Sequence, residues 1–459
     1  MIKSKSAAMD MTQGPILGPL LAFSLPIIFT GVLQLLFNAA DIIVVGQFVD
    51  ETAVAAVGAC TSLISLTINL FIGISLGATV TIANELGAHR EDSLSAVVHT
   101  TYALGVVFGI AMGVIGAAGA RIFLIWMGTP ADILDQAVLY LRIYFAGMPA
   151  FLIYTFGRAI IVPTGDTRKP LYYLTISGVL NVVLNLVLVI GCHLGVAGVA
   201  IATVISQILS AVLMTLALLR LEGPCRLWRN KIRIDRKQLR RIVALGLPAG
   251  LQGTVFSISN VVIQSSVNVL GTLFVAGNAA AFNIEAFIYT AINAVSQGCM
   301  TFNGQNYGAG QLARIDRISR WGLCSVTVLG LVLGFGVYFS GPFLLSIYLP
   351  TSPQAVDYGM IRLAVLTTTY ALCGLMDCAT GNLRGINRSV FPMAATVVGS
   401  CVLRVVWAFT VFRWFLDTAS PSFAFRILMV SYPVSWALTF AALQIYYLRV
   451  RRKMDREIA

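Results

Sequence analysis

Long apolar runs recur from near the start of the chain to its end, and only short polar segments separate them. A helix needs about 20 predominantly apolar residues to cross the hydrocarbon core of a bilayer, where its backbone polar groups must be satisfied internally. The runs therefore predict membrane-spanning helices. We expect twelve of them, at residues 17–45, 53–82, 96–124, 137–161, 170–191, 196–219, 243–269, 276–303, 321–347, 359–382, 391–414 and 424–448.

The composition of the chain agrees with this pattern. Hydrophobic residues make up 58% of the sequence and charged residues 11%, whereas soluble domains carry about 25% charged residues. Twelve spans and their loops use most of the 459 residues. We therefore predict an all-α polytopic membrane protein without a large domain outside the bilayer.

One connecting segment is long and basic. Residues 220–242 hold nine of the 31 Lys and Arg residues, and they divide the chain into an N-terminal lobe, 1–219, and a C-terminal lobe, 243–459. A basic segment can bind nucleic acid, but between two spans it is more often a loop that faces anionic lipid headgroups. We expect a cytoplasmic linker and no nucleic-acid partner.

Basic residues also predict the orientation of the chain. The two termini and every second loop hold 24 Lys and Arg residues, whereas the opposite loops hold about three, Arg121, Arg413 and Arg426. Short cytoplasmic loops carry such an excess. We expect a multi-pass protein of a bacterial-type plasma membrane with both termini in the cytoplasm.

Cysteine and histidine residues give no sign of a metal or an active site. The eight cysteines lie mostly inside apolar runs without paired spacing, and His89, His99 and His193 form no cluster with them or with carboxylates. The cysteines are typical of small core residues. We expect no bound metal, no cofactor and no enzymatic activity.

The two halves of the sequence repeat each other. "LAFSLPIIFTGVLQLLFNAADIIVVG" aligns with "VALGLPAGLQGTVFSISNVVIQSSVN", so that Pro26 meets Pro248 and Asn38 meets Asn260 at an offset of 222 residues. Each half holds six predicted spans, an even number, so both halves have the same orientation in the membrane. Their pseudo-symmetry axis should run along the membrane normal, with a central cleft suited to alternating access.

Several motifs resemble those of the multidrug and toxic compound extrusion family. They are the first run quoted above, "GDTRKPLYYLTISGVLNVVLNLVLV", "GVAGVAIATVISQ" and "GNLRG", and their order covers nearly the whole chain. The resemblance implies two six-helix lobes that form a V. It also implies export of lipophilic, often cationic, compounds in exchange for Na⁺ or H⁺.

Three carboxylates lie well inside the predicted spans: Asp41, Glu285 and Asp377. An ionisable group at the centre of a span costs about 2.5–3.5 kcal/mol on insertion scales, which makes each a functional candidate. Asp41 could instead be a wet interfacial residue, and Asp377 could form a structural pair with Arg384. Apolar or small residues flank Glu285, so we expect it to attract cationic substrates.

Helical spacing extends Asp41 and Glu285 into polar stripes, and Asn260 and Gln264 form a further stripe. Positions i, i+4 and i+7 share a helix face, which places Gln34 and Asn38 beside Asp41 and Tyr289 beside Glu285. Such amides could merely bond neighbouring helices, at under about 1–2 kcal/mol each. The predicted lining of the substrate cleft consists of Gln34, Asn38, Asn260, Gln264, Glu285, Tyr289 and Asp377.

The family resemblance implies partners for Asp41. The matching positions are Asn181, Asn185 and Thr203, and Asn185 departs from the aspartate that is common there. Two acids suit a Na⁺ site of oxygen ligands, whereas a single buried acid relieves its burial cost by binding a proton. We therefore slightly favour H⁺ over Na⁺ as the coupling ion.

Pro26 lies inside the first span, where its missing N–H kinks the backbone, so it could act as a hinge, although prolines are also ordinary in spans. The leading hypothesis is a monomeric, cation-coupled multidrug exporter that contacts small-molecule substrates and membrane lipids. The alternative is a lipid-linked precursor flippase of the same superfamily. A flippase would need a more cationic cavity than Arg142, Arg158 and Arg404 provide.

Overall fold

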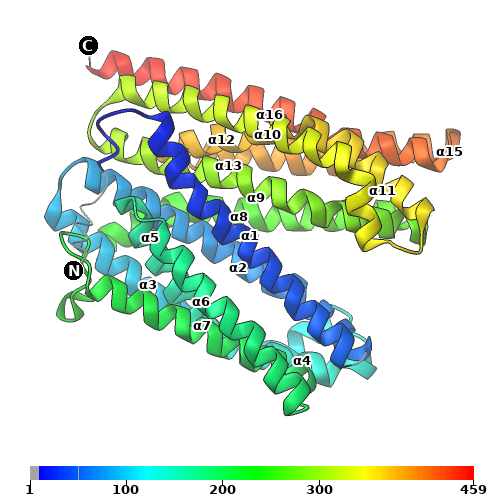
Figure 1. The fold of residues 1–459 in the computed structure, drawn as a ribbon. Helices are drawn as coiled ribbons and strands as arrows, with labels where there is room; N and C mark the ends of the chain where they lie inside the picture. Colours follow the sequence, from blue (N-terminus) through cyan, green and yellow to red (C-terminus); the bar gives the residue numbers. More distant parts are fainter. Residues whose placement is uncertain (1–9, 50, 459) are drawn as a thin grey trace. The chain divides into compact units, whose positions relative to one another are not determined.

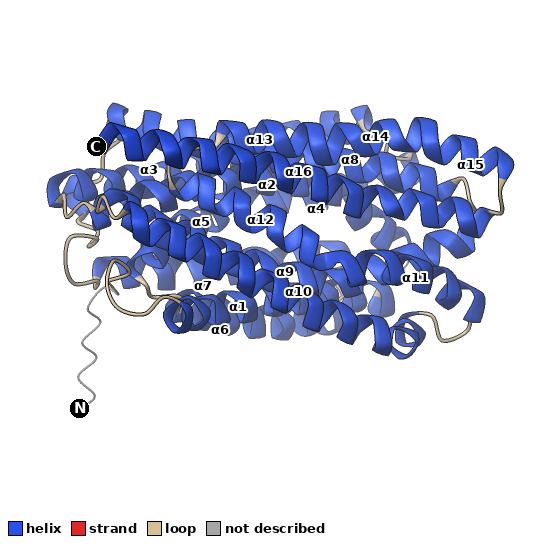
Figure 2. Ribbon diagram, turned by 90° about the horizontal axis from the view of Figure 1, so that it is seen from above, coloured by secondary structure: helices blue, strands red, loops and turns tan. Residues whose placement is uncertain are grey.

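The computed structural model describes residues 10–49 and 51–458, and every regular element in that part of the chain is a helix (Figures 1 and 2). Several of these helices continue directly into short π-helical or 3-10 segments. The elements of the first half are α1 (Leu17–Phe48), α2 (Glu51–Gly87), α3 (Glu91–Trp126), α4 (Ala131–Ala146), α5 (Met148–Ile161) with η1 (Val162–Thr164), α6 (Arg168–Asn185) with η2 (Leu186–Gly191), and α7 (Gly195–Leu219).

The second half repeats this order after a linker with one 3-10 turn, η3 (Arg229–Lys231). Its eleventh span consists of short helical pieces. The elements are α8 (Arg236–Asn268), α9 (Thr272–Gly308), α10 (Leu312–Tyr348), α11 (Pro353–Leu366) with η4 (Thr367–Thr369), α12 (Tyr370–Gly385), α13 (Val390–Thr396), η5 (Val397–Val402), α14 (Leu403–Trp407), η6 (Ala408–Phe412), α15 (Arg413–Thr418) and α16 (Pro421–Ile458).

All twelve predicted spans fall on these helices, most of which extend beyond the predicted ends, whereas α7 matches the span predicted at 196–219 to within one residue. In the part of the chain that the structure describes, ten helices are long and apolar enough to cross a membrane, and the pair α4–α5, bent by 44°, makes eleven. The bend lies at Gly147, and Pro149 follows it in the first turn of α5. The span predicted at 276–303 corresponds to α9. This helix is not among the ten, because polar residues such as Asn278 and Glu285, which are buried, lower its mean hydropathy.

The chain divides into two compact units, and the division falls inside two helices rather than in the linker. Unit 1 contains Leu25–Leu247, and unit 2 contains Thr12–Ser24 and the chain from Pro248 onward. The first turns of α1 thus pack with unit 2, and the first turns of α8 with unit 1. Each break lies beside a proline inside its helix, Pro26 or Pro248.

Glycines allow close helix contacts at equivalent places in the two units. In unit 1, a Cβ atom added to Gly77 of α2 would lie 2.3 Å from the carbonyl oxygen of Ile242 and 2.5 Å from the nitrogen of Gly246, both on α8. In unit 2, the three atoms nearest to a Cβ on Gly298 of α9 all belong to side chains, those of Leu20 and Ser24 at 2.9 Å and that of Phe23 at 3.5 Å. Small residues let helices in membranes approach in this way.

The linker is tied to α3 of unit 1 through buried polar groups. His99 accepts a hydrogen bond from the backbone N–H of Trp228 at 2.9 Å, and its other ring nitrogen lies 2.6 Å from the carbonyl oxygen of Ser95. Thr100 accepts from the backbone N–H of Asp235 at 3.1 Å. Cys225, also in the linker, is buried.

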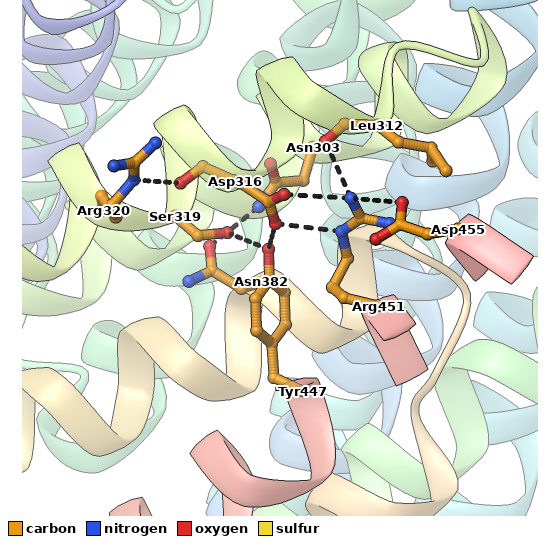
Figure 3. Close-up of polar contacts among 9 residues, drawn as sticks. All are labelled: Asn303, Leu312, Asp316, Ser319, Arg320, Asn382, Tyr447, Arg451 and Asp455. Carbon is orange, nitrogen blue, oxygen red and sulfur yellow. Dashed lines mark hydrogen bonds and ion pairs between the residues drawn. The ribbon is translucent and has the colours of Figure 1, made fainter. Parts of the chain in front are cut away.

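In unit 2, the last turns of α16 are tied to the start of α10 (Figure 3). Arg451 donates two hydrogen bonds of 2.9 Å to the carboxylate of Asp316, and one of 3.2 Å to Asp455. The hydroxyl of Tyr447 donates to Asp316 at 2.9 Å and accepts from Ser319 at 3.0 Å. A bidentate arginine–carboxylate pair of this kind fixes both distance and direction.

Candidate functional site

The predicted partners of Asp41 lie together in unit 1. Asp41 on α1 accepts a hydrogen bond from the amide of Asn185 at the end of α6. The same amide lies 3.4 Å from the side-chain oxygen of Asn181, whose own amide donates to Thr203 of α7 at 3.4 Å. One acid and three neutral polar side chains from three helices therefore form a connected chain.

The local sequence explains how these helices meet. Asn181 and Asn185 are one helical turn apart, so both side chains lie on one face of α6. Gly178, one turn earlier, lies against the ring of Phe37 on α1 so closely that a Cβ atom would overlap it. The π-helical segment η2 begins directly after Asn185, and such segments are frequent at functional sites.

The charge of Asp41 has no cationic partner. Within the described residues, Lys, Arg and His nitrogens all lie more than 4.0 Å from its carboxylate, which is half-buried. The phenol groups of Tyr140 and Tyr144 are electrostatic neighbours of this acid. The side-chain oxygen of Asn185 is buried and has no hydrogen-bond partner. The cluster therefore offers a carboxylate and neutral oxygens, a set that can accept a proton or a hard cation.

The rest of the predicted stripe on α1 lies apart from this cluster. Gln34 and Asn38 are exposed, and the hydrogen bonds found around Asp41 in the described residues include neither. Their place in a substrate cleft stays a prediction.

Glu285 lies in a second polar cluster, in unit 2. Arg362 of α11 donates from Nε and Nη2 to its two carboxylate oxygens, both at 2.9 Å. The side chain of Glu285 is 4% exposed and that of Arg362 is 3% exposed. The Nη1 group of Arg362 donates to the side-chain oxygen of Asn278 at 2.7 Å. This geometry is a fully buried, bidentate ion pair.

Amide side chains carry this cluster on to α8. Asn278 donates to Gln264 at 2.9 Å, and Gln264 donates to Asn268 at 3.0 Å. The structure thus joins two predicted cleft residues, Gln264 and Glu285, through a network that the helical stripes did not anticipate. Asn260, one turn before Gln264, is half-buried and lies outside the network formed by these residues.

The ion pair between Glu285 and Arg362 was not foreseen from the sequence. Sequence reasoning considered Arg142, Arg158 and Arg404 as the arginines within the membrane and overlooked Arg362. Its signal was present, because Arg362 lies within the span predicted at 359–382. The ion pair balances the charge of Glu285, and the attraction of Glu285 for cationic substrates stays a prediction.

Asp377 on α12 forms a third group with residues of α9. Its carboxylate lies beside Tyr289 and Asn293, and Arg384 is an electrostatic neighbour. Arg384 instead donates to Gln252 at 2.8 Å, and the structure records no ion pair within 4.0 Å between it and Asp377. One carboxylate oxygen of Asp377 is buried without a hydrogen-bond partner. The structural pairing of Asp377 with Arg384 is therefore only a loose one.

Comparisons with known proteins cover nearly the whole chain. The model of the family described as MatE matches residues 26–187 and again 248–410, once in each half. The chain is 27% identical to "Probable multidrug resistance protein YoeA" of Bacillus subtilis, over 94% of this chain and 93% of that protein. It is 23% identical to "Probable multidrug resistance protein NorM" of Thermotoga maritima, over 86% of each.

The fold is similar to that of a solved protein, "Crystal structure of MATE in the bent conformation", with a TM-score of 0.89. The match covers 99% of each chain at 18% sequence identity. At this identity the likeness concerns the fold.

Proposed function

The chain belongs to the MatE family, and from this premise we propose that it is a secondary active exporter that moves lipophilic compounds out of the cell in exchange for a cation. Members of this family are multi-pass membrane transporters rather than enzymes. The names of both relatives support a range of drug-like substrates. The alternative, a lipid-linked precursor flippase, has less support, since Arg142 is exposed and Arg362 is paired with Glu285, so that neither adds to the buried charge of Arg404.

One observation carries the coupling proposal: Asp41 is an acid held only by neutral side chains. Binding a proton removes its charge and the cost of burying it. A Na⁺ ion would have to give up its water for one carboxylate and a few neutral oxygens. The coupling ion is therefore H⁺, and Asp41 is the group that carries it.

Alternating access requires a joint between parts of the protein that stay rigid. The division of α1 and α8 into different units beside Pro26 and Pro248 supports such joints at both prolines. Proline removes one backbone hydrogen bond from a helix and so lowers the cost of bending there. Pro26 lies on the same helix as Asp41, so protonation and bending can be coupled.

The test is efflux from proteoliposomes under separately imposed proton and sodium gradients. A proton gradient should drive efflux in the wild type, and Asp41→Asn should abolish the driven part. Asp41→Glu should be a partial defect, because it moves the oxygens by about one methylene. The matched control is Asp135→Asn, which removes an exposed carboxylate of the same unit. Efflux that follows only the sodium gradient would refute proton coupling.

Orientation can be tested through single cysteines. Cys192 is exposed in a loop that we place outside the cell, whereas Cys225 is buried in the linker, and burial raises the pKa of its thiol to about 12. Only the thiolate reacts readily. With Cys324 replaced by Ser, a membrane-impermeant maleimide should label Cys192 in intact cells and leave Cys225 unlabelled. Arg229→Cys, at an exposed linker position, should react only in inverted vesicles; labelling in intact cells would reverse the topology.

A further inference from the structure

Unit 2 contains a buried arginine that the transport proposal does not use. Arg404 lies on α14, a single turn between two π-helical segments, η5 and η6. It is 1% exposed and is the largest of the fully buried side chains. Within the described residues, its only hydrogen bond runs from Nε to the hydroxyl of Ser435 at 2.8 Å, and Nη2 is buried without any partner.

Aromatic rings surround the guanidinium group. Its central carbon lies 4.1 Å from the ring centre of Tyr432, 5.3 Å from that of Phe256 and 5.7 Å from that of Trp436. Rings at these distances stabilise the cation and present flat apolar surfaces beside it. Two of the rings come from α16 and one from α8, so the cage joins three spans.

The positive charge of Arg404 is not balanced by the chain. No carboxylate in the described residues lies within 4.0 Å of it, and its electrostatic neighbours are Tyr432, Cys373, Cys401 and Arg362. Arg362 is itself a cation, already paired with Glu285. Arg451, another deeply buried arginine of this unit, forms an ion pair with Asp316. Arg384 also has a buried donor without a partner, but Asp377 is its electrostatic neighbour. Arg404 differs because its unpartnered donor lies in an aromatic cage and no carboxylate is among its electrostatic neighbours.

We propose that Arg404 is a recognition site for an acidic group, a carboxylate or phosphate, on an aromatic compound that the protein transports. The unpartnered Nη2 group donates to the acid, and the rings of Tyr432 and Trp436 stack against the aromatic part. The proposal rests on the proposed export function and specifies the substrate class. Zwitterionic compounds satisfy it as well as anions do.

The test compares two probes with the same xanthene core: fluorescein, which is anionic, and rhodamine 123, which is cationic. Binding to the full-length protein is measured by fluorescence anisotropy in nanodiscs of phosphatidylcholine, without any ion gradient. The wild type should bind fluorescein, and Arg404→Gln should weaken that binding at least tenfold while changing rhodamine 123 binding less than twofold. Arg404→Lys keeps the charge but loses the planar fork, so it should lie between them.

Arg426→Gln is the matched control, because it removes an exposed arginine from the same unit; it should leave fluorescein binding unchanged. Equal weakening of both probes by Arg404→Gln would overturn the proposal and make Arg404 a structural cation. If Arg404→Gln does not fold, two other results can overturn the proposal. The first is failure of the wild type to bind fluorescein. The second is full fluorescein binding by folded Arg404→Lys together with equal loss of both probes in Tyr432→Leu.

A phospholipid headgroup could supply the same acidic chemistry. Repeating the measurement in nanodiscs that contain phosphatidylglycerol separates the two sources: fluorescein binding that this lipid abolishes would overturn the assignment to a transported compound. Asp135→Asn, which removes an exposed carboxylate outside the coupling cluster, should bind fluorescein as the wild type does. Binding is measured without an ion gradient, so its result is read separately from proton coupling, which only the efflux experiment tests.

Discussion

The two units bury an acid inside the membrane by different means. In unit 1, Asp41 is held by the amide of Asn185 and by no cation among the described residues. In unit 2, two donor groups of Arg362 bind Glu285. An acid with a fixed cation keeps its charge, because losing it would leave the arginine unpaired. An acid with neutral neighbours can gain or lose a charge. The difference separates a group suited to coupling from one suited to structure.

The two units also differ in the atoms that face equivalent glycines. Gly77 of unit 1 contacts backbone atoms of α8, whereas Gly298, at the equivalent place in unit 2, contacts the ends of side chains. Backbone atoms cannot move aside without moving a helix, but side chains can change rotamer. The repeat therefore preserves where the helices cross and changes how rigid the crossing is.

We expect the largest loss of stability when the ion pair between Glu285 and Arg362 is broken. Arg362→Gln leaves Glu285 buried and uncompensated, so it should cost about 3–5 kcal/mol of stability. Asp41→Asn, which leaves no cation behind, should cost less than about 1 kcal/mol. Thermal unfolding of the purified protein measures both. The double variant Glu285→Gln/Arg362→Gln should recover most of the loss; no recovery would mean that Arg362 stabilises unit 2 by packing alone.

A second prediction compares the two glycines. Gly77→Ala forces backbone atoms apart and should cost about 1–3 kcal/mol, as overpacked cores do. Gly298→Ala needs only small shifts of Leu20 and Ser24, so its cost should be clearly lower. The same unfolding measurement decides the matter, and equal losses would show that the two crossings are equally rigid.

A third prediction makes the site of unit 1 more negative. Asn185→Asp places a second carboxylate beside Asp41, and two acids supply the charge that a Na⁺ ion lacks in the wild type. Efflux driven by a sodium gradient should rise several-fold in proteoliposomes, with Asn181→Asp as a control one turn away. An unchanged response to sodium would mean that residue 185 does not choose the ion.

The smallest effect is expected at the end of the hydrogen-bond chain. Thr203→Val keeps the shape of the side chain and removes an acceptor that lies 3.4 Å from Asn181, near the upper limit for such a bond. Stability should fall by about 1 kcal/mol or less, and proton-driven efflux should be reduced rather than lost. Complete loss of coupling would place Thr203 beside Asp41 in importance.

The candidate site could be predicted from the sequence only in part. Asn181, Asn185 and Thr203 were placed around Asp41 by resemblance to a family, and the structure brings these four residues together. The partner of Glu285 was missed, because Arg362 is 77 positions away in the sequence. Helical periodicity relates residues one or two turns apart on a single helix, so it grouped Glu285 with Tyr289 and could not relate it to another span.

The sequence by itself determined the helices, their number and the internal repeat, because the length of an apolar run and the spacing of prolines and glycines are local properties of the chain. It also contained every charged residue that matters inside the membrane. Only the tertiary structure decided which charges are compensated. Compensation depends on contacts of a few ångströms between helices far apart in the sequence. Arg362 binds Glu285, while the hydrogen bonds that Asp41 and Arg404 form with other described residues involve neutral side chains.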